Sequence, residues 1–289
     1  MGMKIFDIFL YCSLTILLVI CLYPFVYMIN ISISDSHEIA NGTVYLIPKG
    51  IQFNAIEAVL KTKTIWRGYA NSVLYAATGT LLSLILGTTA AYVLTVKGFK
   101  AGKYIMIFFT VTMFFNGGMI PTFLIIKKLG LLDTIWAIVI LPSLSAWNII
   151  LFRTNFRGIP KALIDSARID GANHFWIFGK VVIPLSKAII ATLGLFAVVA
   201  QWNSFFPALL YLTSQDKQPL MMVLRKLVIT GNFRGEEMIS GLKVGMNEMG
   251  FTRSIQMSVI LISLGPTIFV YPFVQKYFAK GVLVGSIKG

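Results

Sequence analysis

Residues 159–184 read IPKALIDSARIDGANHFWIFGKVVIP, a polar segment set between two long apolar runs. Pro160 suits the first turn of a helix, because the backbone N–H that proline lacks is not needed there. Gly171 suits the left-handed conformation that ends a helix. The aromatic-rich residues 175–178 then begin a second helix, and Pro184 marks the entry into the apolar run that follows. The segment therefore predicts a short amphipathic helix, a bend, and a second helix anchored at a membrane surface by aromatic side chains.

The composition around this segment defines an integral membrane protein. Hydrophobic residues make up 57% of the 289-residue chain, charged residues only 12%, and the mean hydropathy is +0.80. A helix needs about 20 apolar residues to cross the hydrocarbon core. Six such runs are predicted, at residues 8–31, 69–96, 104–121, 134–152, 186–212 and 255–276. The expected fold class is all-α, with residues 1–289 forming a single transmembrane domain.

The loops between the runs predict the orientation. Lys97, Lys100 and Lys103 lie in one short loop, which the positive-inside rule places in the cytoplasm. Both termini and residues 159–184 are then cytoplasmic, and residues 213–254 form the longest extracytoplasmic loop. Basic residues that flank the spans, together with anionic membrane lipid, account for most of the net charge of +14. Nucleic acid is therefore not an expected partner.

The sequence lacks the residues needed for ion-driven transport, ATP binding, metal binding or catalysis. The core of each predicted span lacks Asp, Glu, Lys, Arg and His, although ion-driven carriers usually need such groups for coupling. No phosphate-binding G-x-x-x-x-G-K-[ST] loop, metal-ligand spacing or catalytic motif is present. We therefore expect no catalytic residue, no metal and no cofactor in this chain. The energy for any transport is expected to come from a partner.

At this point the sequence resembles the permease subunits of ATP-binding-cassette (ABC) importers. Their last long cytoplasmic loop carries Glu-Ala-Ala, three residues, Gly, nine residues and Ile-x-Leu-Pro. Here Asp165-Ser166-Ala167, Gly171 and the residues up to Pro184 match that spacing. Asp165 stands where Glu is usual and Ser166 where Ala is usual. The shorter stem of Asp165 reduces the reach of its carboxylate.

The resemblance extends to a branch of that family. The chain is similar to the carbohydrate-uptake, maltose-type permeases through Leu141-Pro142, Trp202-Asn203 and the glycine-containing tail at 281–289. The segment Phe115-Asn116-Gly117-Gly118-Met119-Ile120-Pro121 resembles a subgroup that imports complex or acidic oligosaccharides. The resemblance implies a type I ABC importer permease fold in a bacterial inner membrane. The implied partners are a second homologous permease, two ATPase subunits that bind ATP and Mg, an extracytoplasmic solute-binding protein and an oligosaccharide.

The resemblance also assigns a role to residues 159–184, whose first helix would dock in a cleft of an ATPase subunit and move with it. The predicted docking residues are Ala162, Asp165, Ser166, Ala167, Arg168, Asp170, Gly171 and Ala172. The competing interpretation is an ordinary connector at the membrane interface.

Two further regions are candidates for contact with solute or binding protein. Asn116 and Gly117 interrupt the third apolar run, where unpaired backbone suits a water-filled cavity. Gln201, Trp202 and Asn203 offer amide and indole groups to sugar hydroxyls and rings, or serve as polar contacts between helices. In the outer loop, Asn232, Arg234 and Lys243 mark a region that the resemblance assigns to the binding protein. A solvated loop without such a role is the alternative.

Small residues also recur at every fourth position of the second apolar run. Gly79, Ser83, Gly87 and Ala91 predict a close approach by another helix, which belongs either to this chain or to a second permease. A carbohydrate importer permease is thus the leading hypothesis. A permease of the same architecture for a peptide or polyamine, and a membrane scaffold without a transport path, are the alternatives.

Overall fold

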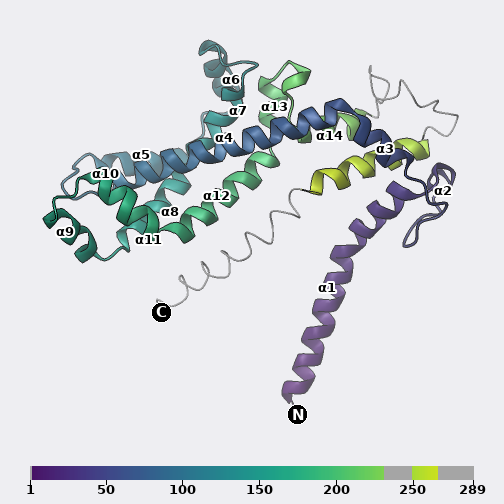
Figure 1. Cartoon of the computed structure of the whole chain (residues 1–289), viewed down its shortest axis with the longest axis horizontal. Coiled ribbons are helices and arrows are strands. Elements are labelled where there is room, and N and C mark those ends of the chain that lie inside the picture. The colour runs from purple at the N-terminus through teal and green to yellow at the C-terminus, as the bar shows by residue number, and fades with distance from the viewer. Residues whose placement is uncertain (1, 231–248, 266–289) are drawn as a thin grey trace. The chain divides into compact units, whose positions relative to one another are not determined.

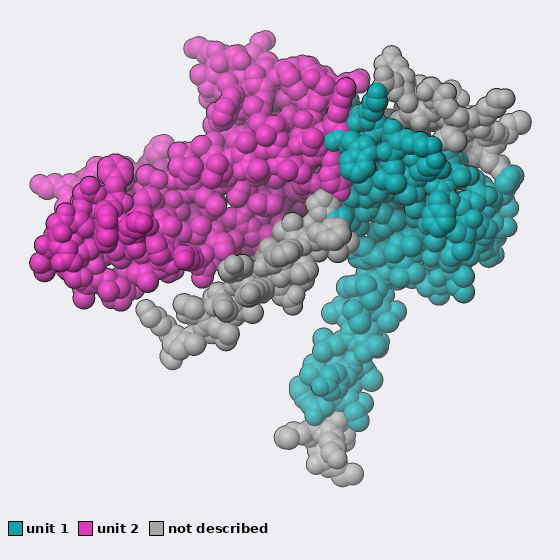
Figure 2. All heavy atoms as spheres, viewed as in Figure 1, with its two compact units in different colours: residues 1–66, 223–266 teal, residues 67–222, 267–289 magenta. Residues whose placement is uncertain are grey.

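The computed structural model describes residues 2–230 and 249–265, which are helical and contain no strand. The described chain divides into two compact units, coloured separately in Figure 2. Unit 1 comprises residues 1–66 and 223–266, and unit 2 comprises residues 67–222 and 267–289. Asn232, Arg234, Lys243 and the tail at 281–289 lie outside the described residues.

Unit 1 is built around the N-terminal helix α1. Its helices are α1 (Gly2–Ile33), α2 (Ser36–Ala40), α3 (Asn54–Lys61), the first residues of α4 (Lys63–Val93), the last turns of α14 (Leu220–Thr230) and a helix over 249–265 (Figure 1). Ile31, Ile39 and Val44 form a small core, with Tyr27 and Met257 packed against it. The hydroxyl of Ser254 donates to the carbonyl of Ser32 at 3.2 Å.

Helix α1 is apolar all round its surface. Every side chain from residue 6 to residue 26 is exposed, and Phe6–Ile33 has a hydropathy of 2.3 over its most apolar window. A helix without a polar face is stable only inside a membrane or a large apolar core. The first predicted span is therefore present as one continuous helix.

Unit 2 contains the remaining helices. They are the rest of α4, α5 (Gly102–Phe114), α6 (Met119–Lys128), α7 (Ile135–Ser143), α8 (Ala146–Arg157), α9 (Lys161–Ile169), α10 (His174–Ile177), the π-helical turn η1 (Phe178–Val182), α11 (Ile183–Leu185), α12 (Lys187–Trp202), α13 (Phe206–Tyr211), the 3-10 turn η2 (Gln215–Lys217) and the start of α14. In Figure 1, α9 and α10 lie beyond the C-terminal end of α4.

Several of the predicted runs are bent or broken. Among the described residues, two helices are long and apolar enough to span a membrane, or up to five if each bent pair is one span. The third run breaks at residues 115–118, as expected from Asn116 and Gly117, and turns by 118° into α6. The fourth bends by 45° after Ser143. The chain bends by 81° between Leu185 and Lys187, at the start of the fifth run, and the helix that follows ends at Trp202, ten residues earlier than predicted. Six spans remain a prediction.

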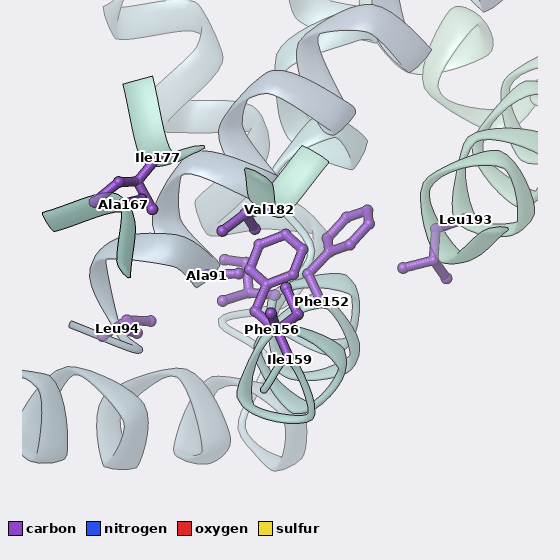
Figure 3. Close-up of a cluster of buried hydrophobic side chains, with 10 residues drawn as sticks. Ala91, Leu94, Phe152, Phe156, Ile159, Ala167, Ile177, Val182 and Leu193 are labelled. Carbon is purple, nitrogen blue, oxygen red and sulfur yellow. The ribbon is translucent and has the colours of Figure 1, made fainter. Parts of the chain in front are cut away.

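The main hydrophobic core of unit 2 packs residues 159–184 against α4, α8 and α12 (Figure 3). The cluster contains Ala91, Leu94, Ile149, Phe152, Phe156, Ile159, Ala167, Ile177, Val182 and Leu193. These residues come from α4, α8, α9, α10, η1 and α12, together with the turns at Leu94 and Ile159. Shape-matched packing holds such clusters together where lipid already surrounds the helices. Ala167 of α9 and Leu193 of α12 therefore belong to one packed cluster.

The small-residue stripe on α4 packs within this chain. A Cβ at Gly79 would lie 2.3 Å from Nε2 of Gln201, and one at Gly87 would lie 3.2 Å from the ring of Phe152. Ser83 is buried, and Ala91 belongs to the main core. Of the two interpretations left open by the sequence, the structure favours the one in which α8 and α12 of the same chain occupy the stripe.

The region predicted as a long glycine-rich outer loop is partly helical. Helix α14 runs through 220–230, and Leu220, Met222 and Val223 on it are buried. Gly250, in the last part of this region, lies in the helix over 249–265, and a Cβ there would be 1.9 Å from the carbonyl oxygen of Ser36. That glycine is a close-packing position, because the backbone of another helix approaches it directly.

Candidate functional site

Helix α9 ends in the turn that the sequence predicts. Gly171 has a φ of +79°, in the left-handed region. The N–H of Gly171 donates to the carbonyl of Arg168 at 3.0 Å, and the N–H of Ala172 donates to that of Ala167 at 2.9 Å. These two bonds form a Schellman motif, which satisfies carbonyls left free at a helix end. Asn173 then caps α10 by accepting from the N–H of Trp176 at 2.8 Å.

One face of α9 is fastened to unit 2 and the rest is exposed. Ala167 is buried in the main core, and Ile164 and Ala172 pack against that core. Ala162, Asp165, Ser166, Arg168, Asp170 and Gly171 are exposed. The docking role of all eight predicted residues stays a prediction, but Ala167 acts in this structure as the contact that holds α9 to its own chain.

Large apolar side chains lie exposed beside the charged ones. Ile169 is 87% exposed and Phe175 is 88% exposed, and both flank the Schellman turn. Asp165 and Arg168 form an ion pair at 3.7 Å on the exposed face of α9. Exposed pairs of this kind add little to helix stability. Both charges therefore remain available to a partner surface.

The second helix of the predicted pair is shorter than expected. Helix α10 is a single turn that continues into η1 and α11. Phe175 and Trp176 are exposed, whereas the ring of Phe178 packs against Tyr92 at 5.1 Å between centroids. The hydroxyl of Tyr92 also lies 3.1 Å from Nδ1 of His174. The end of α4 is thus joined directly to the turn that follows α9, a contact that the sequence analysis missed.

A cavity of about 400 Å³ lies between α9 and the ends of α4 and α8. Tyr92 and Val96 line it on one side, Phe156 on another, and Ile164 and Asp165 line it from α9. Helix α9 is therefore held by its contacts with the main core, and the cavity lies next to those contacts.

Gln201 and Trp202 are buried at the end of α12. Their side chains are 6% and 7% exposed, and the Trp202 ring meets that of Tyr69 edge-on at 5.6 Å. Oε1 of Gln201 and Nε1 of Trp202 have no hydrogen-bond partner in the part of the chain that is described. A buried acceptor and donor without partners cost free energy, so such groups usually meet water, another subunit or a ligand. Asn203, the next residue, is exposed.

Asn116 and Gly117 form the exposed break between α5 and α6. Oδ1 of Asn116 accepts from the N–H of Gly118 at 3.0 Å, and Gly118 has a φ of +87°. Among the described residues, no hydrogen bond or ring contact joins this break to Gln201 or Trp202. The two halves of the predicted substrate path are therefore separate features of unit 2.

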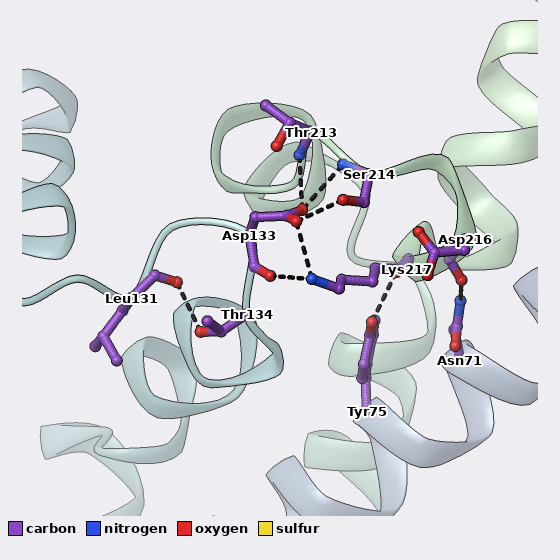
Figure 4. Close-up of polar contacts among 9 residues, drawn as sticks. All are labelled: Asn71, Tyr75, Leu131, Asp133, Thr134, Thr213, Ser214, Asp216 and Lys217. Atoms are coloured by element: carbon purple, nitrogen blue, oxygen red, sulfur yellow. Dashed lines mark hydrogen bonds and ion pairs between the residues drawn. The ribbon is translucent and has the colours of Figure 1, made fainter.

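A polar network around Asp133 is a further feature that the sequence analysis missed (Figure 4). The Asp133 carboxylate accepts from the Lys217 ammonium at 2.9 Å, from the Ser214 hydroxyl at 2.5 Å, and from the N–H groups of Ser214 and Thr213 at 2.9 and 3.1 Å. Tyr75 donates to the carbonyl of Lys217 at 2.7 Å. The network ties the loop before α7 to η2 and α4.

Asp133 also has a backbone conformation that asparagine and aspartate tolerate. Its φ is +56°, and it is the one described residue other than glycine with a positive φ. The one sign of this network in the sequence was a single acidic residue between the apolar helices α6 and α7. Its partners lie about 80 positions away in sequence, so its pairing was not predictable.

Asp133 should make stability depend on pH. Hydrogen bonds from Ser214 and Lys217 hold the pKa of its carboxyl well below the ordinary 3.8. A depressed folded pKa means that the stabilisation is complete above 3.8 and is lost as the pH falls below that value. We expect Asp133→Asn to lower the thermal unfolding midpoint of the purified protein at pH 7, and the difference from wild type to shrink below pH 3.8. A difference that stays constant between pH 7 and pH 3 would contradict this.

The bent helices, the continuous apolar α1 and the exposed, core-anchored α9 define a helical membrane protein. The chain belongs to the family described as binding-protein-dependent transport system inner membrane component, whose model matches residues 79–284. The resemblance stated from residues 159–184 is thereby confirmed, and the chain is a membrane component of an importer.

Named relatives agree with this assignment. The chain is 38% identical to the polygalacturonan/rhamnogalacturonan transport system permease protein YtcP of Bacillus subtilis, over the whole of both chains. It is 37% identical to protein LplC of the same organism, covering 93% of this chain and 90% of that one. A chain of a bacterial ABC transporter involved in import of the acidic polysaccharide alginate matches with a TM-score of 0.85 and 35% identity, over 95% of this chain and 97% of that one.

Proposed function

We propose that this chain is a permease subunit of an ATP-driven importer of oligosaccharides, with fragments of acidic polysaccharides as its solutes. The observation that carries the proposal is the Schellman-capped helix α9, which presents charged and apolar side chains outward while Ala167 fastens it to the core. The relatives support the solute class, because one is named for polygalacturonan and another for alginate. Both solutes are acidic polysaccharides.

Helix α9 would act as the element through which ATPase subunits move the permease. ATP binding closes two ATPase subunits, which would carry α9 with them, and hydrolysis would reset it. Ala167 packs in the same cluster as Val182 and Leu193, so the motion would reach α12 through contiguous side chains. Gln201 and Trp202 stand at the far end of α12. Their unpartnered polar atoms would meet sugar hydroxyls or the second permease.

The remaining parts of the proposal concern assembly and sidedness. A second homologous permease would complete the path, and a solute-binding protein would deliver the oligosaccharide from outside. Both termini and residues 159–184 would face the cytoplasm, and 213–254 would face outward. ATP and Mg would bind to the partner ATPases.

The solute class can be tested by reconstituting the chain with its partner permease, ATPase and binding protein in liposomes. We expect oligogalacturonate or alginate oligosaccharides to stimulate ATP hydrolysis more than a neutral oligosaccharide of the same length. Stimulation by a peptide or a polyamine, with none by any oligosaccharide, would instead favour a permease of the same architecture for another solute.

Charge reversal on α9 tests the docking role. Asp165→Lys and Arg168→Glu should each weaken association with the ATPase about tenfold, because interfacial charges that meet complementary partners lose that attraction when reversed. Co-purification of the ATPase gives the readout, and the amount of chain in the membrane should not change. Asp216→Lys makes the same change in an exposed residue of η2 and should leave association intact. Normal association of both α9 variants would identify residues 159–184 as a connector.

A further inference from the structure

A cavity lined by basic residues lies along α5 and the loop between α4 and α5. It has a volume of about 730 Å³. We propose that it binds the head group of an anionic phospholipid, with one acyl chain lying along α5. This site goes beyond the proposed transport function, which requires no lipid of a particular charge.

Five cations surround the cavity. They are Lys97, Lys100 and Lys103 from the loop and the start of α5, and Arg153 and Arg157 from the last turns of α8. The described residues that line the cavity include no acid, and none of the five cations forms an ion pair within the described part of the chain. Five uncompensated positive charges around one hollow favour an anionic occupant.

The wall of the cavity changes from charged to apolar along a single helix face. Lys103, Met106, Ile107, Thr110 and Val111 line it at positions i, i+3, i+4, i+7 and i+8 of α5. The hydroxyl of Thr110 donates to the carbonyl of Met106 at 2.8 Å, so that its polar group is satisfied within the helix. This face extends about 12 Å from Lys103 to Val111. A molecule with an anionic head and an apolar tail matches it, whereas a free anion would leave the apolar part without a contact.

The backbone at the charged end of the cavity is tied to α8 and turns tightly. Nε of Arg153 donates to the carbonyl of Leu94 at 3.2 Å, which joins α8 to the loop. Gly98 turns the loop with a φ of +86°, and Phe99 folds over Gly102 so closely that a Cβ there would lie 3.2 Å from its ring. Because Arg153 is already held by its bond to Leu94, it loses less conformational entropy on binding an anion than a free side chain would.

The test compares two pairs of lysines in the full-length chain, purified with the subunits that accompany it. Lys100→Gln/Lys103→Gln removes two charges from this cavity and leaves Lys97 and Arg157, which also line the cavity beside α9. Lys127→Gln/Lys128→Gln removes two exposed charges at the end of α6 and serves as the matched control. The probe is phosphatidylglycerol, compared with phosphatidylcholine of the same acyl chains, and binding is measured by native mass spectrometry and by lipid titration.

We expect the wild type and the control to retain phosphatidylglycerol in preference to phosphatidylcholine, and the Lys100/Lys103 variant to bind it roughly 30-fold more weakly, at roughly fivefold per basic side chain. An equal loss of phosphatidylglycerol binding in both variants would show that general surface charge binds the lipid, and would contradict the proposed site. Displacement of the lipid by millimolar inorganic phosphate would show a simple anion site and would also overturn it. So would normal lipid binding by the Lys100/Lys103 variant combined with lost ATPase association, because an acidic protein segment would then be the occupant.

Discussion

Replacing Gly171 with valine should abolish most transport while leaving the chain in the membrane. A β-branched residue at a φ of +79° clashes with its own backbone, at a cost of about 1–2 kcal/mol or more. The Schellman turn would open, and its bonds from Gly171 and Ala172 to α9 would be lost. Since nothing else lies within 4 Å of the added Cβ, the effect would come from backbone conformation alone. Uptake and solute-stimulated ATP hydrolysis in liposomes provide the measurement, with an expected loss of about tenfold or more.

Gly179→Val is the matched control for this substitution. Gly179 lies in η1 of the same segment, has no positive φ, and has no atom within 4 Å of an added Cβ. It should retain most activity. Full uptake by the Gly171 variant would show that this turn does not transmit motion and would favour the alternatives of a connector or a membrane scaffold.

Replacing Gly250 with alanine should destabilise unit 1, although alanine is the better helix former by about 1 kcal/mol. The added Cβ would lie 1.9 Å from the carbonyl oxygen of Ser36 and 3.2 Å from the N of Ala40, and neither backbone atom can rotate away. The helix over 249–265 or α2 must therefore shift, which typically costs about 1–3 kcal/mol. We expect a lower thermal unfolding midpoint and less protein recovered from membranes.

Gly194→Ala provides the comparison. Gly194 is also helical, but an added Cβ there would meet the terminal methyl of Leu84 at 3.3 Å, and that side chain can adjust. Its unfolding midpoint should change little or rise. If both variants behaved alike, helix propensity rather than backbone contact would govern the site at Gly250.

Local signals in the sequence predicted the elements that depend on one or two residues. Gly171 ends α9 in the predicted left-handed turn, and Asn116 and Gly117 break the third apolar run where expected. In both places the conformational preference of the residue itself determines the backbone. The family assignment followed from such local spacing, because a helix, a turn and a proline at fixed distances describe one compact segment.

Features that depend on distant residues were not predictable in the same way. Pro184 marked a break before α12, but the 81° angle at that break, where Ser186 is buried, depends on tertiary packing. The close contact between Gly250 and Ser36 had no local signal, because it joins residues more than 200 positions apart. Gln201 was predicted to contact sugar, but the sequence did not show that its side chain packs against Gly79. Each case needs the tertiary packing before the residue can be interpreted.

The break after α5 has a consequence for the isolated chain in a lipid bilayer. Helix α5 has 13 residues and is about 20 Å long, shorter than the roughly 30 Å hydrocarbon core. Non-helical backbone at 115–118 is tolerated in lipid only where protein or water shelters it. An isolated copy of the chain in lipid would therefore need another protein surface or water at this break.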